Sequence, residues 1–143
     1  MSLFAAIRPD DWNLPLFVHV AGAMVLVGAL VLAITAAASE NHRLAFRTLL
    51  YAAIPSWIAM RVSAQWIFSK ENLDDLDPEP AWIGIGFMTS ESTLLLIIAA
   101  TVCAWRAGRR ERGGGLRTAT LVLTGIVLVA YVVAVWAMTT KPS

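Results

Sequence analysis

Four long apolar runs fill most of this chain of 143 residues. Each is longer than the roughly 20 residues that a helix needs to cross about 30 Å of hydrocarbon. Because backbone groups inside lipid must be satisfied within their own segment, each run is predicted to be a helix. None alternates apolar with polar residues, as a membrane β-strand would. The runs are 14–38, 44–68, 81–105 and 118–140.

Little chain is left outside these runs. Hydrophobic residues make up 58% of the sequence and charged residues only 15%, which leaves no length for a separate soluble domain. The sequence therefore predicts an all-α, polytopic membrane protein. We expect one transmembrane domain over residues 1–143, an antiparallel four-helix bundle with short links.

The charges of the links predict the orientation. Arginines lie in the first and third links, whereas the second link has one lysine among five acids, and short Arg-rich loops stay on the cytoplasmic side. The protein is therefore predicted to lie in the cell membrane with both termini outside the cytoplasm. The arginines are Arg43 and Arg47, then Arg106, Arg109, Arg110, Arg112 and Arg117; the second link carries Lys70, Glu71, Asp74, Asp75, Asp77 and Glu79.

Motifs of soluble enzymes are missing. Cys103 is the only cysteine, which excludes an intrachain disulfide and a thiolate metal cluster. No phosphate-binding loop, nucleophile elbow or paired-histidine zinc motif occurs. The Arg-rich third link is too short to bind nucleic acid, so we expect it to contact lipid headgroups.

A small set of polar side chains lies inside the apolar runs. In the predicted topology His19, Arg61, Gln65, Glu91 and Tyr131 all fall in the outer half of the membrane. An arginine at mid-helix costs about 2.5–3.5 kcal/mol on insertion scales, so it should find a partner. Glu91 is the only acid in the four runs, and we predict that it pairs with Arg61. The pair fixes helix register or serves a function; the sequence leaves both open.

His19 is the only imidazole inside the runs, and a neutral imidazole is a good metal ligand. Gly22, one turn further on, would leave room for a flat ring such as a porphyrin to lie against the helix. The second axial ligand would be Met88, Met138 or a His19 from a second protomer, unless that position is open. The alternative is a hydrogen-bonded histidine that only packs.

Two stretches resemble a group of small four-helix membrane proteins. They are Leu16 to Leu32, LFVHVAGAMVLVGALVL, and Arg43 to Trp66, RLAFRTLLYAAIPSWIAMRVSAQW. The group includes the copper-resistance D type and the membrane protoporphyrinogen oxidase of the haem pathway. The resemblance implies that His19 contacts haem or porphyrin. Where the oxidase members have a lysine in the third helix, this chain has Ser90 and Glu91, a departure that speaks against the oxidase activity.

The first functional hypothesis is a membrane protein that binds haem b in its outer half. His19 would ligate the iron and Arg61 would pair with a propionate, with Gln65 and Tyr131 as further hydrogen-bonding groups. Electron transfer to or from a quinone or another membrane redox partner would be its task.

Two alternatives belong to other classes. A cofactor-free accessory subunit would join a homodimer or a larger membrane complex through apolar helix faces. Small residues such as Ala29, Ala33 and Ala37 would let helices approach closely, inside the bundle or between protomers. A transporter for a small solute or ion would use His19, Arg61 and Glu91 as a relay, although four short helices without an internal repeat fit this class poorly.

Overall fold

The computed structural model describes residues 13–70, 75, 81–111 and 114–140, which are almost entirely helical. The all-α fold class is confirmed for this part of the chain. Most of the acidic second link, which entered the orientation argument, lies outside the described residues.

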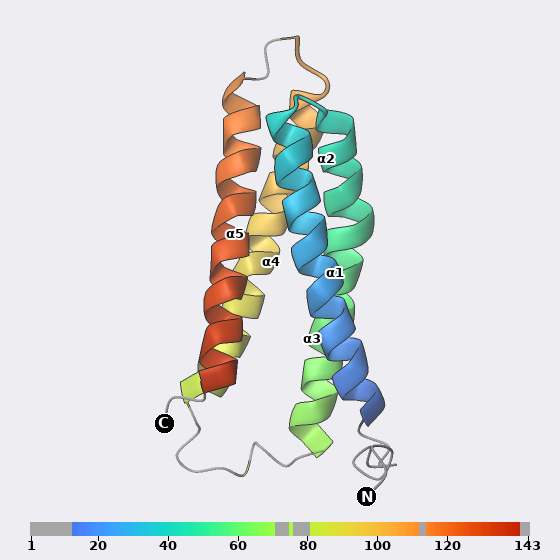
Figure 1. The fold of residues 1–143 in the computed structure, drawn as a ribbon. Helices are drawn as coiled ribbons and strands as arrows, with labels where there is room; N and C mark the ends of the chain where they lie inside the picture. Colours follow the sequence, from blue (N-terminus) through green and yellow to red (C-terminus); the bar gives the residue numbers. More distant parts are fainter. Residues whose placement is uncertain (1–12, 71–74, 76–80, 112–113, 141–143) are drawn as a thin grey trace, which may run out of the picture.

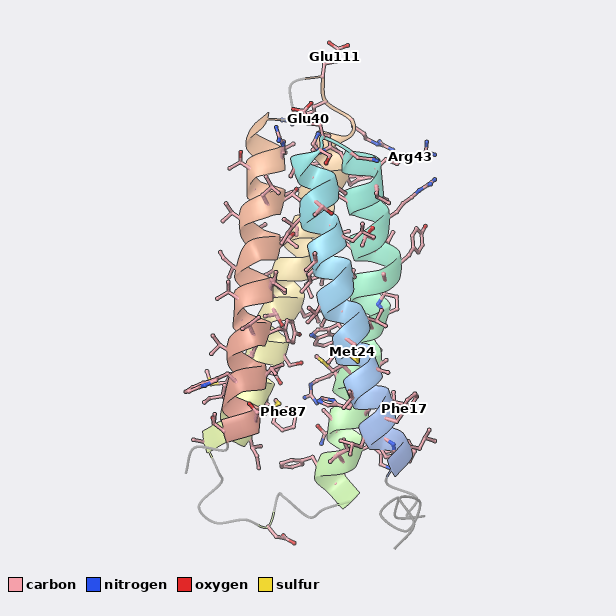
Figure 2. The ribbon with its side chains drawn as sticks, in the orientation of Figure 1. Phe17, Met24, Glu40, Arg43, Phe87 and Glu111 are labelled. Atoms are coloured by element: carbon pink, nitrogen blue, oxygen red, sulfur yellow. The ribbon has the colours of Figure 1, made fainter. Side chains whose placement is uncertain are left out.

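Among the described residues, three helices are long and apolar enough to cross a membrane. They are α1 (Asn13–Ala38), α4 (Ala81–Ala107) and α5 (Gly114–Thr140). Their bounds agree with the predicted runs to within a few residues. Large apolar side chains point outward from them, for example Phe17 and Met24, which are 69% and 71% exposed (Figure 2). An apolar exterior of this kind suits contact with lipid.

The second run is helical throughout but is interrupted by a short π-helix. It consists of α2 (His42–Thr48), the π-helix η2 (Leu49–Ala53) and α3 (Ile54–Lys70). Pro55 has no N–H and cannot continue an α-helical ladder. The backbone widens just before it, so that the Ile54 N–H bonds to the Leu49 carbonyl. The Ser56 hydroxyl donates to the Ala52 carbonyl at 2.6 Å, which satisfies a group near the widened turn.

The four helical stretches lie side by side (Figure 1). α1 begins and α5 ends at one end of the structure, where α3 also ends and α4 begins. α1 packs against α3 and α5, α4 packs against α5, and α2 contacts α1 and α4 at the opposite end. The ribbons of α3 and α4 diverge toward the end at which α1 begins (Figure 1).

Alanines of α1 form much of the core. Ala29, Ala33 and Ala37 are all buried within the molecule, together with Leu26 and Leu30. Small side chains let neighbouring helices approach closely. The alanine stripe noted in the sequence is therefore used for packing inside the chain, which removes it as an argument for an external partner.

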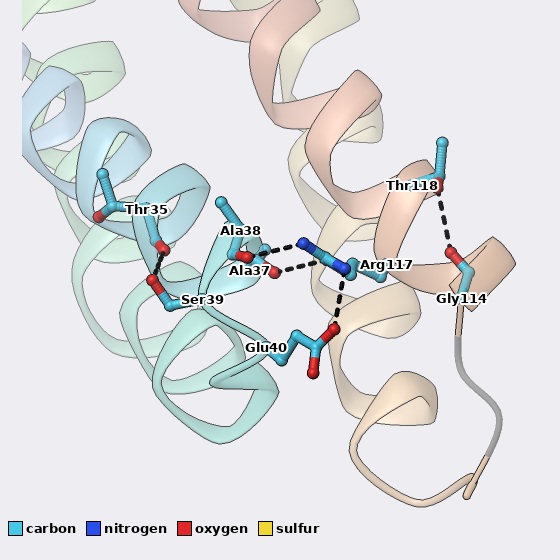
Figure 3. A network of polar contacts seen from close by, with 8 residues as sticks. All are labelled: Thr35, Ala37, Ala38, Ser39, Glu40, Gly114, Arg117 and Thr118. Carbon is cyan, nitrogen blue, oxygen red and sulfur yellow. Dashed lines mark hydrogen bonds and ion pairs between the residues drawn. The ribbon is translucent and has the colours of Figure 1, made fainter.

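Arg117, near the start of α5, connects this helix to the C-terminal end of α1 (Figure 3). Its guanidinium donates to the carbonyls of Ala37 and Ala38 at 3.1 and 2.7 Å and to the Glu40 carboxylate at 3.0 Å. Glu40 itself has a φ of 61°, and its N–H bonds back to the Ala37 carbonyl at 3.1 Å. These contacts satisfy carbonyls that the last turn of a helix leaves free.

Candidate functional site

A cavity of about 190 Å³ lies between α1, α3, α4 and α5, in the half of the structure where α1 begins. Its walls are mostly apolar, including Met60, Phe68 and Val135. Three polar side chains that the sequence places in one half of the membrane, His19, Arg61 and Tyr131, also line it. The packing thus brings them to one cavity from three different helices.

His19 is held in one orientation by α3. Its Nδ1 lies 3.0 Å from the Met60 carbonyl oxygen, and because a carbonyl only accepts, Nδ1 must carry the proton. Nε2 is then the unprotonated nitrogen, and it makes no hydrogen bond to the described residues. A backbone carbonyl on Nδ1 is the usual support of a histidine that uses Nε2 as a ligand.

Gly22 does not have the role that the sequence suggested. A Cβ at this position would lie 3.2 Å from both the Met60 nitrogen and the Ser56 oxygen. The space beside Gly22 is therefore filled by the backbone of α3, and no flat ring fits there. The glycine instead lets α1 approach α3 closely, which brings the Met60 carbonyl within reach of His19.

The predicted pair of Arg61 and Glu91 is present. Arg61 Nη2 and Glu91 Oε1 are 3.7 Å apart, and Arg61 Nη1 donates to Gln65 Oε1 at 3.0 Å. The guanidinium also lies over the Phe87 ring, 4.7 Å from its centre. The Arg61 side chain is 24% exposed, whereas that of Glu91 is 71% exposed. Gln65 and Glu91 are thus at the surface beside the cavity and reach it only through Arg61.

Ser90 is a cavity residue that the sequence reading did not place in the site. Its hydroxyl is buried and has no hydrogen-bond partner among the described residues, while its carbonyl accepts from the Trp57 indole at 3.0 Å. A buried hydroxyl without a partner is uncommon in proteins. The hydroxyl-rich stretch from Thr89 to Thr93 inside an apolar run is the sequence signal for it.

Tyr131 contacts α4 through Thr93. The two hydroxyl oxygens are 2.9 Å apart, and Thr93 Oγ1 is also 2.6 Å from the Thr89 carbonyl. Because the single Thr93 proton serves that carbonyl, the Tyr131 hydroxyl donates to Thr93. Tyr131 therefore ties α5 to α4 beside the cavity and keeps its own oxygen as an acceptor.

The two candidate methionines lie in different places. Met138 lines the cavity, and its terminal methyl group fills the space that the missing side chain of Gly86 leaves. Met88 is 75% exposed and does not line the cavity. Of the two, only Met138 can contact a ligand next to His19. Among the described residues no group of three or more His, Cys, Asp or Glu side chains could hold a bare metal ion.

Comparison with protein-family models, with curated proteins and with solved structures finds no match to this chain. The resemblance to the copper-resistance D and protoporphyrinogen oxidase group therefore stays a prediction from the two stretches that carry it.

Proposed function

We propose that the chain is an antiparallel four-helix transmembrane bundle of the cell membrane, with both termini outside the cytoplasm. Three apolar helices of membrane-spanning length support this placement, as do the apolar side chains on their outer faces. Arg43 lies at the end of the structure opposite Phe17 and Phe87 (Figure 2), the end that the positive-inside rule assigns to the cytoplasm. In this orientation the cavity belongs to the outer half of the membrane.

Within the cavity we propose that the protein binds haem b, which His19 Nε2 would hold through the iron. The observation that carries the proposal is the hydrogen bond from His19 Nδ1 to the Met60 carbonyl. This bond leaves the lone pair of Nε2 available to a metal at a mostly apolar cavity. Met138 would supply a second donor, and Arg61 would pair with a propionate. Bound haem would supply one-electron chemistry, which suits transfer to or from a membrane redox partner such as a quinone.

The size of the cavity limits how such a ring sits. Its volume of about 190 Å³ exceeds the roughly 150 Å³ of a cavity that binds benzene, but it is below the about 300–1,000 Å³ of pockets that enclose larger ligands. The donor set fits haem, while the cavity holds only part of a porphyrin. The rest of the ring would extend beyond the cavity.

An absorption spectrum of the purified protein, reconstituted with haemin, tests the haem proposal. We expect a Soret band that His19→Ala abolishes and Met138→Leu shifts. Met88→Leu is the matched control, because this exposed methionine lies away from the cavity, and its spectrum should equal that of the wild type. A protein that gives no Soret band after reconstitution does not bind haem.

The cavity volume and the buried Ser90 hydroxyl favour a second candidate, the ring of a lipid-soluble quinol or quinone. A single ring with small substituents suits the volume. His19 Nε2 can accept from a quinol hydroxyl, and the unpartnered Ser90 hydroxyl can donate to a quinone oxygen.

Titration with a short-chain quinone, followed by quenching of tryptophan fluorescence, tests this second candidate. His19→Ala and Ser90→Ala should each weaken binding several-fold, and Met88→Leu should not. Saturable quinone binding by a protein without a Soret band would establish the second candidate in place of the first.

A further inference from the structure

Glu91 presents a carboxylate on the outside of α4, within a membrane-spanning segment. The span begins at Ile83, eight residues before Glu91, which at 1.5 Å per residue corresponds to a depth of about 12 Å. The side chain is 71% exposed, and its ionic contact with Arg61 is 3.7 Å long. A charge at this depth is costly in lipid and normally faces protein or water.

The surface around Glu91 combines this charge with exposed apolar and amide groups. Met88 and Leu95, one turn before and one turn after Glu91 on α4, are 75% and 70% exposed, and Gln65 of α3 is exposed as well. We call Gln65, Met88, Glu91 and Leu95 the α3–α4 face. Arg61 borders this face and is held in position by Gln65 and by the Phe87 ring. Lipid chains can pack against Met88 and Leu95, but they offer no hydrogen-bond or ionic partner to the Glu91 carboxylate or the Gln65 amide.

The α3–α4 face has both an acid, Glu91, and a neighbouring base, Arg61, so its charges can complement those of a second copy of the same face. Two copies inserted in the same orientation and related by a two-fold axis along the membrane normal place each residue at the same depth in both copies. Arg61 and Glu91 are in contact and therefore share a depth within one copy. Arg61 of one copy can then meet the partner subunit's Glu91, while Glu91 meets the partner subunit's Arg61. A different membrane protein would have to supply a matching base and acid of its own.

We propose that the α3–α4 face is the interface of a homodimer, closed by reciprocal pairs between Arg61 and Glu91. The second copy covers the exposed carboxylate and gives it a second guanidinium. Met88 and Leu95 pack against the same residues of the partner. The proposal rests on the membrane placement above and does not depend on whether the cavity binds haem or a quinone.

Two charge variants test the reciprocal pairs. Arg61→Glu gives the face two acids, and Glu91→Arg gives it two bases, so each variant should repel its own copy. When the two are co-expressed with different affinity tags, acid meets base at both contacts. We expect each variant alone to lose at least ten-fold in co-purification of its own differently tagged copy, and the mixed pair to return to the wild-type amount. If Arg61 and Glu91 acted only within one chain, mixing would restore nothing, and the proposal would be overturned.

Disulfide cross-linking tests the face without changing its charges. In a Cys103→Ser background we expect Met88→Cys and Leu95→Cys to form dimers on oxidation of native membranes. Val129→Cys is the matched control, because this apolar residue is 63% exposed on α5, away from the proposed face. Equal cross-linking at Val129, or none at the two α4 positions, would overturn the dimer. Release of the chain by alkaline extraction would instead refute the membrane placement.

Discussion

Two glycines of α1, six residues apart, have opposite surroundings. A Cβ at Gly22 would meet the α3 backbone at 3.2 Å, whereas one at Gly28 would meet nothing within 4 Å. Backbone atoms cannot move aside as the end of a flexible side chain can. At the scale of single residues, the close packing of α1 against α3 therefore requires a glycine at position 22, whereas position 28 has room for a side chain.

Gly22→Ala should destabilise the protein by about 1–3 kcal/mol, because the added methyl group forces α1 away from α3. Gly28→Ala should leave stability unchanged or raise it by up to about 1 kcal/mol, since alanine favours the helix. Thermal unfolding in detergent, followed by circular dichroism, measures both. Similar losses for the two variants would contradict the close approach at Gly22. The Gly22 variant should also weaken ligand binding, because it shifts Met60 relative to His19.

At the scale of elements, Arg117 caps the end of α1 from the start of α5 (Figure 3). Replacing it with alanine frees the carbonyls of Ala37 and Ala38 and breaks the ion pair with Glu40. Because the side chain is 34% exposed, water compensates part of the loss, and we expect a cost of about 1–2 kcal/mol.

Arg117→Lys separates capping from charge. A lysine keeps the positive charge but cannot donate to two carbonyls and a carboxylate from a planar fork, so it should recover less than half of the lost stability. Arg110→Ala is the control, because Arg110 is exposed and its side chain makes no contact of this kind with the described residues; it should change stability by less than about 0.5 kcal/mol. Full recovery by lysine would mean that only the charge matters.

At the scale of the whole molecule, the orientation in the membrane is open to a labelling test. In a Cys103→Ser background, Asp75→Cys lies in the second link and Glu111→Cys in the third. A membrane-impermeant maleimide added to sealed right-side-out vesicles should label position 75 at once and position 111 only after permeabilisation. The reverse pattern would place both termini in the cytoplasm and move the cavity to the inner half.

Local sequence predicted the helices well because helix formation in lipid depends on the length and hydrophobicity of each segment alone. The same reasoning placed His19, Arg61 and Tyr131 in one half of the molecule and predicted the contact between Arg61 and Glu91. It did not predict how the break at Pro55 is accommodated, because a π-helix depends on neighbouring turns and no hydropathy pattern specifies it.

The sequence by itself determined the long apolar segments, their helical structure and the position of each polar residue along its segment. Only the tertiary structure decided which way those residues face. Helix packing buries the alanines of α1, fills the space beside Gly22 with α3, turns Met138 toward the cavity and leaves Met88 and Glu91 outside. The physical reason is that hydropathy is a property of a segment, whereas a cavity forms only where side chains of several helices fail to fill the space between them.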